Sequence, residues 1–340
     1  MIEREDIFID DNDKIEINVV GYKKRGESII FSIGNKFMGV IDCYKKRDLF
    51  LTKKIIQDKK MKIDFLCWTH SDWDHTYGLS ELKEFFYEDT HIIVPSGFQA
   101  KEFRNFLEAD SNRGYQYDEY LKVLSIFDKL DYENYHTANQ DSYYYSFSLR
   151  KIGSIVESEK YDVKIYAFSP ISKKIKEYNC NHIKSVYDKD TQWYENMNAD
   201  NNLFSVGLII EIGNKTKVNK ICLTGDLDNE TLMTMRNETR EKLFLRNTFL
   251  KIPHHGSKNS NMIFEFDNKK MKFNYAACTS FKSRGGILPS NIMLDEYKKY
   301  GIVHRTNLKD SFGYGIIKYE IPIINDDEIQ VSVYGDAGQC

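Results

Sequence analysis

The stretch Thr69-His70-Ser71-Asp72-Trp73-Asp74-His75 gives the strongest indication of fold and function in this sequence. An apolar run over 63–68 precedes it and has the length and composition of a buried strand. Two imidazoles and two carboxylates then fall within six residues, 70 to 75. Imidazole and carboxylate are the side chains that bind divalent cations in proteins. The stretch therefore predicts a site for one or two divalent cations, rather than an ordinary surface loop.

Two later stretches extend this prediction. The run Lys220-Ile221-Cys222-Leu223-Thr224-Gly225-Asp226 reads as a buried strand that ends on a carboxylate. The run Phe249-Leu250-Lys251-Ile252-Pro253-His254-His255-Gly256-Ser257 reads as a strand that ends in paired imidazoles and a glycine turn. Polar side chains at the ends of separate strands can converge on one edge of a sheet, where loops carry functional groups on a rigid scaffold.

In their order and surroundings these residues resemble the metallo-β-lactamase superfamily, whose first motif reads His-x-His-x-Asp-His. Here Asp72 replaces the second His of that motif. Other motifs resemble the hydrolase domain of ComEC-type DNA-uptake proteins and their soluble relatives more closely. These motifs are Gly26-Glu27-Ser28, Gly39-Val40-Ile41-Asp42-Cys43, Asp200-Asn201-Asn202 with Ser205, Leu223-Thr224-Gly225-Asp226, Pro253-His254-His255-Gly256-Ser257, Leu288-Pro289-Ser290 and Val303-His304-Arg305-Thr306. The resemblance runs from about residue 18 to 320 and breaks over a middle segment.

The resemblance implies an α+β fold of the four-layer αββα sandwich type, in one domain over residues 1–340. The strands and helices expected from the sequence agree with it, beginning with a meander of three strands over 15–42. The segment 97–160 departs from the family pattern. We expect it to be an insertion, with helices near 98–107 and 117–129 and a Tyr-rich run over 132–145, that serves as an active-site lid or a surface for a protein partner.

The resemblance also implies the roles of the site residues. His70 and Asp72 would hold a first metal ion, Asp74 and His75 a second, and Asp226 would bridge both. The last ligand would be His255, with His254 as a catalytic neighbour that orients a substrate oxygen or donates a proton. The opposite assignment of these two histidines is open. At the place of the family's third-motif His the chain has Asn201-Asn202, so water or an amide oxygen would complete the first site.

The family's chemistry then predicts a hydroxide that bridges two metal ions and attacks the substrate, with Asp74 accepting its proton. A shell without thiolate suits Zn²⁺, Mn²⁺ or Fe²⁺, and the added carboxylate of Asp72 favours Mn²⁺. Two divalent ions, three carboxylates and a hydroxide give a neutral site, so an anionic substrate needs further cations. Candidates for substrate contact lie beside the predicted ligands: Asn202, Ser257, Lys258, Lys282 and Arg284.

Composition limits the possible partners and the cellular location of the protein. A net charge of −3 gives no overall attraction for nucleic acid, so a local basic patch would have to supply it. The six cysteines show no Cys-x-x-Cys pairing, and four of them (43, 67, 222 and 278) fall in strand patterns, which is typical of a reducing compartment. The acidic start of the chain does not read as a signal peptide, and no apolar run approaches about 20 residues, so we expect a soluble, cytoplasmic protein.

Three functions follow from these patterns. The first is a phosphodiesterase or nuclease acting on nucleic acid or another phosphodiester. The second is a hydrolase of neutral esters, lactones or thioesters with the same metal chemistry. The third is a metal-binding scaffold subunit of a multi-protein system, such as one for defence against foreign DNA, with 97–160 as its partner surface. Fold alone does not choose among them.

Overall fold

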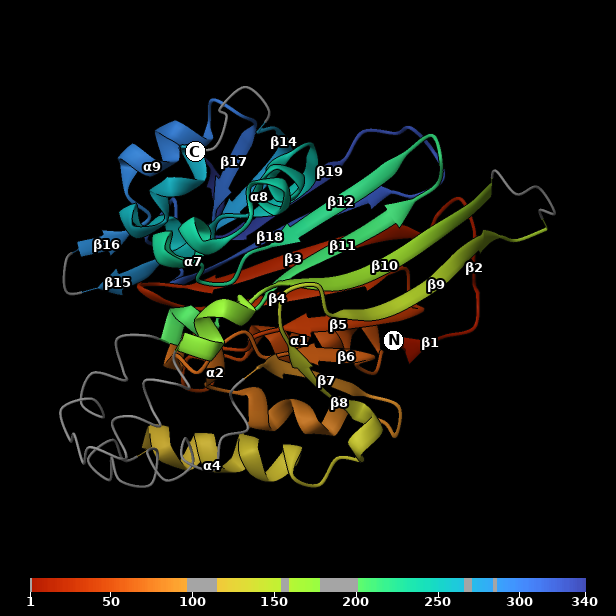
Figure 1. Ribbon diagram of the computed structural model, residues 1–340, viewed down its shortest axis with the longest axis horizontal. Coiled ribbons are helices and arrows are strands. Elements are labelled where there is room, and N and C mark those ends of the chain that lie inside the picture. The colour runs from red at the N-terminus through yellow and green to blue at the C-terminus, as the bar shows by residue number, and fades with distance from the viewer. Residues whose placement is uncertain (1, 97–114, 154–158, 178–200, 266–270, 284–285) are drawn as a thin grey trace.

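The computed structural model describes residues 2–96, 115–153, 159–177, 201–265, 271–283 and 286–340 (Figure 1). Two large β-sheets lie face to face, and helices cover the outer face of each (Figure 1). The architecture is therefore α+β with four layers in the order α, β, β, α, as the sequence predicted.

One sheet has eight strands in the order β19-β18-β3-β4-β5-β6-β7-β8. Its strands are β3 (Lys14–Tyr22), β4 (Arg25–Ile33), β5 (Phe37–Ile41), β6 (Phe65–Cys67), β7 (His91–Pro95), β8 (Tyr135–Ala138), β18 (Tyr314–Pro322) and β19 (Gln330–Gly335). The predicted meander of three strands is confirmed as β3, β4 and β5. From β5 to β8 the strands run parallel to one another.

The other sheet has ten strands in the order β1-β9-β10-β11-β12-β13-β14-β17-β20, with β2 also paired to β9. Its strands are β1 (Ile2–Glu3), β2 (Ile7–Ile9), β9 (Tyr143–Lys151), β10 (Lys160–Ser169), β11 (Gly207–Gly213), β12 (Val218–Leu223), β13 (Asn247–Lys251), β14 (Phe273–Cys278), β17 (Ile302–Arg305) and β20 (Gly338–Gln339). From β12 to β17 the strands are again parallel.

Three apolar clusters hold the four layers together. The central cluster joins the facing sides of the two sheets, with Ile17 and Phe31 from one sheet packed near Phe147 and Ile210 from the other. The other two clusters lie between each sheet and its own helices. Because strands such as β4 and β5 are buried on both faces, they read in the sequence as nearly continuous apolar runs.

Helices on the outer face of the eight-stranded sheet are α1 (Leu51–Lys59), α2 (Trp73–Thr76), η1 (Leu79–Phe85) and α4 (Tyr115–Phe127), with the short turn η3 (Tyr132–Asn134). The ten-stranded sheet carries α7 (Asn229–Thr234), α8 (Asn237–Phe244), η7 (Pro253–Gly256), η8 (Lys258–Phe264) and α9 (Asn291–Tyr297). A hairpin, β15 (Phe281–Ser283) and β16 (Gly286–Leu288), and the turn η6 (Asn201–Phe204) are further described elements, and residues 172–177 are helical.

Part of the segment predicted as an insertion contributes strands to both sheets. Residues 135–138 form β8 in one sheet, and residues 143–151 form β9 in the other. Tyr145 and Phe147 are buried in the central cluster because β9 faces the opposite sheet. The run therefore belongs to the two sheets of the sandwich. The helix predicted near 117–129 is α4, and its residues Tyr120, Val123 and Phe127 pack on the eight-stranded sheet. The helix predicted near 98–107 lies outside the described residues.

A candidate metal centre at the ends of the parallel strands

The parallel strands of both sheets end on the same side of the molecule, and the predicted site residues follow those ends. His70 follows β6, Asp226 follows β12, and His255 follows β13. Asp74 and His75 lie in α2, which begins after Asp72. The sheets are tied together at this edge, because the Val206 N–H donates a hydrogen bond of 2.9 Å to the Thr69 carbonyl. Ligand-binding groups in sheets of this kind commonly sit beyond the carboxyl ends of the strands.

The predicted ligand side chains meet in space in two groups. In the first group, His70 Nε2 lies 3.7 Å from Asp72 Oδ2 and 4.0 Å from Asp226 Oδ2. In the second group, His255 Nε2 lies 3.2 Å from Asp74 Oδ2 and 3.3 Å from Asp226 Oδ2. The Asp226 carboxylate takes part in both groups, which is the position that a bridging ligand requires.

His75 belongs to the second group. Its Nε2 lies 3.7 Å from Asp74 Oδ2 and 3.6 Å from Asp226 Oδ1. It is also 3.4 Å from His255 Nε2. All of these side chains are buried except that of Asp72, which is 38% exposed. Six side chains of metal-binding type, drawn from both sheets, thus point into one small volume.

The hydrogen bonding of these side chains fits a metal centre. Among the described residues, His70 Nε2, Asp74 Oδ2 and Asp226 Oδ1 are buried atoms without a hydrogen-bond partner. A buried polar atom without a partner costs about 1–3 kcal/mol, and each of these three faces the shared volume. Divalent cations would satisfy all three atoms, so the residues present fit the metal pair that the sequence predicts.

The backs of two imidazoles are held by Asp42, which follows β5. Its Oδ2 lies 2.7 Å from His75 Nδ1 and accepts a hydrogen bond from the Thr69 hydroxyl. The Thr69 oxygen in turn lies 2.9 Å from His70 Nδ1. Asp42 Oδ1 accepts from the Thr69 backbone N–H at 2.7 Å. The sequence marked Asp42 only as part of a family motif. Its hydrogen bond with His75 and its connection to His70 through Thr69 were not predicted.

Glu27 of β4 lies behind the third imidazole. Thr279, which follows β14, donates its hydroxyl to Glu27 Oε2, and its oxygen lies 2.8 Å from His255 Nδ1. Lys251 pairs with the same carboxylate. None of these three residues was a predicted site residue. A charged residue inside an apolar strand was the available signal, because a buried charge requires a partner.

Glu27 and Asp42 are themselves close enough to the imidazoles to be considered as ligands. Their oxygens, however, already accept hydrogen bonds from Lys251, Thr279 and Thr69. The front carboxylates, in contrast, carry the unpartnered oxygens. We therefore place the candidate metal site at the Nε2 side of the imidazoles, with Asp42 and Glu27 behind it.

The electrostatics of the site show its excess of negative charge. Burial disfavours the charged form of His75, but the carboxylates of Asp226, Asp42 and Asp74 outweigh it and raise the pKa of this imidazole well above its ordinary value. In the same way Asp226 and Asp74 overcome burial and raise the pKa of His255 to about 9. Burial alone would raise the pKa of Asp226, yet the imidazoles of His255 and His75 hold it well below its usual range. Cations are thus strongly favoured in this volume.

The two adjacent histidines differ in placement. Both have left-handed backbone conformations, with φ of 47° at His254 and 50° at His255. His255 turns its Nε2 toward Asp74 and Asp226, and the ring of Phe281 stacks on it with centroids 5.2 Å apart. His254 Nδ1 is buried and has no hydrogen-bond partner among the described residues. Burial lowers the pKa of His254. Of the two histidines, His255 is therefore the one whose ring faces the carboxylates of Asp74 and Asp226.

The loop that positions Asp226 is held by Ser205. The Asp226 N–H donates a hydrogen bond of 2.8 Å to Ser205 Oγ. Gly225, with φ of 51°, lies so close that a Cβ there would be 2.5 Å from the same oxygen. Glycine at this position therefore lets the turn approach Ser205 and directs the Asp226 carboxylate into the site.

The predicted substrate-contact residues differ in their exposure and in their hydrogen bonds. Lys258 and Lys282 are exposed beside the site, one in η8 and one in β15. Ser257 is nearly buried, and its Oγ accepts the Asn259 N–H at the start of η8, which is a capping role. Asn202 lies in η6 with a buried Oδ1 that has no partner among the described residues. Arg284 lies outside the described residues.

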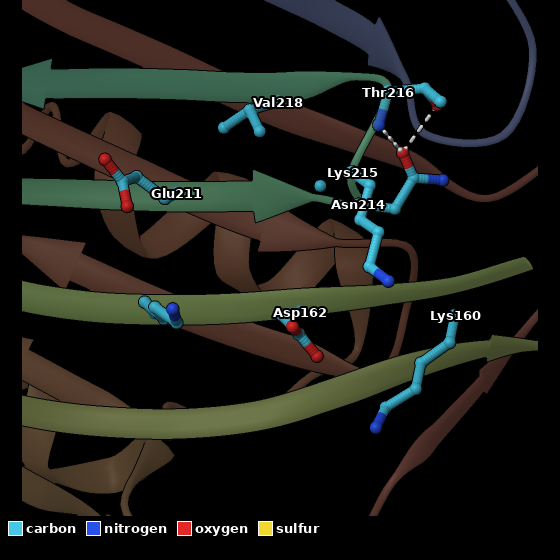
Figure 2. A pocket seen from close by; sticks show the side chains of 9 residues that line it. Lys160, Asp162, Glu211, Asn214, Lys215, Thr216 and Val218 are labelled. Carbon is cyan, nitrogen blue, oxygen red and sulfur yellow. Dashed lines mark hydrogen bonds between the residues drawn. The ribbon is translucent and has the colours of Figure 1, made fainter. Parts of the chain in front are cut away.

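The structure also has a pocket of about 550 Å³ that is separate from this site. Figure 2 shows it on the outer side of β10, β11 and β12. Its lining is Lys160, Asp162, Lys164, Glu211, Gly213, Asn214, Lys215, Thr216 and Val218. None of these residues belongs to the candidate metal centre, and none is a histidine or cysteine. We therefore assign the chemistry to the strand ends and not to this pocket.

No protein-family model matches the sequence, and no curated protein is significantly similar to it. Among solved structures, the chain is similar to the metallo-β-lactamase GOB-18 from Elizabethkingia meningoseptica, with 12% identity and a TM-score of 0.30 over 59% of this chain and 56% of that one. It is also similar to MEM-A1, a subclass B3 metallo-β-lactamase from a soil metagenome library, with 9% identity and a TM-score of 0.32 over 74% and 70% of the two chains.

A third similar structure is a long form RNase Z from yeast, with 10% identity, a TM-score of 0.33, and coverage of 82% of this chain and 39% of that one. The chain spans little more than half of GOB-18. Because all three TM-scores lie below 0.5, a function for this chain has to be argued from its own side chains.

Two further expectations concern cysteines and membranes. Cys43, Cys67, Cys222 and Cys278 are buried and carry free thiols, as their strand patterns predicted. In the described part of the chain, no helix is long and apolar enough to cross a membrane.

Proposed function

We propose that this chain is a hydrolase that depends on two divalent metal ions. The observation that carries this proposal is the meeting of six metal-binding side chains around buried atoms of His70, Asp74 and Asp226 that lack partners among the described residues. The closer relation to the ComEC-type hydrolase domain stays a prediction from the sequence motifs.

In this proposal His70, Asp72 and Asp226 hold one ion, and Asp74, His75, His255 and Asp226 hold the other. The set of three carboxylates and three imidazoles suits Mn²⁺, Zn²⁺ or Fe²⁺. When bound, such a pair of ions activates water near neutral pH and stabilises charge on the attacking and leaving oxygens.

The chain's own residues supply the remaining functions. Asp74 Oδ2 has no partner among the described residues, so Asp74 can accept a proton from the attacking water and orient it. His254 stands beside His255, and because burial lowers its pKa its ring is neutral at pH 7. A neutral imidazole has one N–H and one lone pair, so it can hydrogen-bond a substrate oxygen or give a proton to the leaving group.

We further propose that the substrate is a phosphodiester, most simply in nucleic acid. Lys24, Lys46, Arg47, Lys258 and Lys282 are exposed on segments that adjoin the site. The Lys282 N–H donates to the Lys24 carbonyl, which places the β15–β16 hairpin against the β3–β4 turn (Figure 1). Although the chain as a whole is slightly acidic, we infer that these exposed cations near the site would give it the local positive charge that attracts a polyanion.

The test is a substrate panel with the purified protein loaded separately with Mn²⁺ and Zn²⁺. The panel holds bis(p-nitrophenyl) phosphate, single- and double-stranded DNA, RNA, p-nitrophenyl acetate and a simple lactone, and Asp226→Asn serves as the inactive control. We expect cleavage of a phosphodiester that the control lacks. Turnover of the neutral ester or lactone with phosphodiesters untouched would replace the proposed substrate class. If the protein binds metal but hydrolyses none of these compounds, the scaffold function is favoured.

A further inference from the structure

A buried ion pair lies directly behind the candidate metal centre and has no part in the function proposed above. Lys251 Nζ lies 2.7 Å from Glu27 Oε2, and the side chains are 0% and 2% exposed. Glu27 belongs to β4 in one sheet and Lys251 to β13 in the other, so the pair spans the two sheets. Taking two charges out of water costs several kcal/mol per ion before pairing. An ion pair buried at this place is therefore expected to have a structural or functional role.

The hydrogen bonds around this pair fix the direction of each proton. Lys251 is a donor only, and it donates to Glu27 and, at 3.0 Å, to the carbonyl of Ile252. Beside this ammonium Glu27 is an ionised carboxylate, which can only accept. The single hydrogen of the Thr279 hydroxyl must therefore point to Glu27, as the geometry shows.

The direction of that hydroxyl then fixes the state of His255. The Thr279 oxygen has given its hydrogen to Glu27, so it can only accept from His255 Nδ1, 2.8 Å away. His255 therefore carries its N–H on Nδ1. In the neutral ring the lone pair lies on Nε2, which faces Asp74 Oδ2 at 3.2 Å and Asp226 Oδ2 at 3.3 Å. A metal ion can bind only the nitrogen that has the lone pair.

We propose that Lys251, Glu27 and Thr279 form a positioning relay that holds His255 in the tautomer required for metal binding. The inference rests on the proposed metal centre. Asp42 and Thr69 hold His70 and His75 separately, so the relay acts on one imidazole from the ten-stranded sheet only. Among the described residues, the Lys251 ammonium pairs with Glu27 and the Ile252 carbonyl and not with a proposed ligand, so it acts through Glu27 and Thr279.

Thr279→Val tests the relay, because valine nearly keeps the shape of threonine and replaces its hydroxyl by a methyl group that forms no hydrogen bond. Binding of Zn²⁺ and Mn²⁺ is measured by calorimetry and by competition with a chelator. We expect Thr279→Val to weaken the ion held by His255 by about 10- to 100-fold, which is typical for loss of a hydrogen bond behind a ligand. Thr279→Ser, which keeps the hydroxyl, should bind within a few-fold of wild type.

Thr306→Val is the matched control. Thr306 follows β17 as Thr279 follows the neighbouring β14, and both are fully buried. The Thr306 hydroxyl has no hydrogen-bond partner among the described residues, so its loss should leave metal affinity unchanged. Equal weakening in Thr279→Val and Thr306→Val, or in Thr279→Val and Thr279→Ser, would overturn the relay in favour of packing alone.

A second measurement reads the tautomer without metal. Two-dimensional ¹H–¹⁵N correlation spectra of the metal-free protein distinguish Nδ1–H from Nε2–H histidines. They are recorded at a pH above the pKa of about 9 that His255 has in this protein, where its ring is neutral. We expect His255 to be Nδ1–H in wild type and a mixture in Thr279→Val. An unchanged Nδ1–H tautomer in the variant would overturn the relay. Because this result needs neither turnover nor metal, it stands apart from the proposed function, which fails if wild type binds metal and hydrolyses nothing.

The ion pair itself is tested as a unit. Lys251→Met alone would leave a buried charge on Glu27 and can prevent folding. The double variant Glu27→Leu with Lys251→Met removes both charges and should fold. We expect it to lose metal affinity at the His255 position as Thr279→Val does. A double variant that folds and binds both ions with wild-type affinity would show that the pair serves only to join the sheets.

Discussion

Asp42 is the residue whose substitution tests the candidate site most broadly, because one buried carboxylate serves two histidines. Its Oδ1 accepts from the Thr69 N–H at 2.7 Å, and its Oδ2 accepts from the Thr69 hydroxyl and from His75 Nδ1. The perturbation is Asp42→Asn, which keeps size and shape. Asp42 has a positive φ of 54°, and asparagine tolerates this left-handed conformation as well as aspartate does, so backbone strain does not enter.

The side-chain amide that Asp42→Asn introduces cannot reproduce the pattern of acceptors. If its oxygen faces the Thr69 N–H, its NH₂ opposes His75 Nδ1–H; if it is turned, the NH₂ opposes the Thr69 N–H. One buried donor is then left without an acceptor, at a cost of about 2 kcal/mol. At roughly 2.1 cal/mol/K per residue, unfolding 340 residues has an entropy of about 0.7 kcal/mol/K, so the melting temperature should fall by about 3 °C. Metal affinity should fall by about 10- to 100-fold.

Thermal unfolding of the metal-free protein and metal titration by calorimetry measure the two effects. Asp141→Asn is the matched control, because Asp141 also has a positive φ, of 68°, and is exposed. We expect no change in either measurement for the control. If Asp42→Asn equals wild type in melting temperature and metal affinity, Asp42 does not hold the histidines and the account of the site is wrong.

Three further predictions concern the metal, the substrate and acid stability. Asp72→His replaces an oxygen ligand by nitrogen, so the metal ion that best activates the protein should shift from Mn²⁺ toward Zn²⁺. Equal metal preference in titrations of variant and wild type would show that Asp72 is not a metal ligand. Lys282→Ala should raise KM for a long polyanion more than it lowers kcat and should reduce the salt dependence of binding, whereas Lys164→Ala on the outer face of β10 should do neither. Burial and the neighbouring His91 lower the pKa of His136 to about 4 in the folded protein. In the unfolded chain its pKa is about 6.5, so between these two pH values the unfolded chain binds one proton more than the folded chain. The metal-free protein should therefore lose stability as the pH falls from about 6.5 to about 4, and His136→Gln should flatten this slope in urea titrations; parallel curves would contradict it.

The parts of the site that the sequence predicted are those with a local pattern. His70, Asp226 and His255 each follow an apolar run directly, so their place at a strand end is visible from spacing alone. Parallel strands of a sheet end on one side, and this rule brings Asp226 and His255 together because β12 and β13 are neighbours in one sheet. The approach of His70, which follows β6 of the other sheet, depends on how the two sheets pack and is not visible in the sequence.

The parts that were missed depend on distant pairing. Thr279 and Glu27 are 252 residues apart in the chain, and no local spacing connects them. The Tyr-rich run over 132–145 was assigned to an insertion because its aromatic pattern does not show which sheet it joins. Its strands pair with β7 and β10, and Tyr145 is buried by the opposite sheet. The sheet to which each part of the run belongs is therefore set by tertiary contacts and not by the local sequence.

Metal content is the measurement that tests the central claim most directly. Wild type and Asp226→Asn are purified side by side, equilibrated with Mn²⁺ or Zn²⁺, freed of unbound ion and analysed for metal per chain. Asp226 faces both groups of imidazoles, so we predict about two ions per chain in wild type and loss of most of them in the variant, with the metal-free proteins equally folded by circular dichroism. An unchanged metal content in Asp226→Asn, or a wild type that takes up no metal, would contradict a two-metal centre at this site.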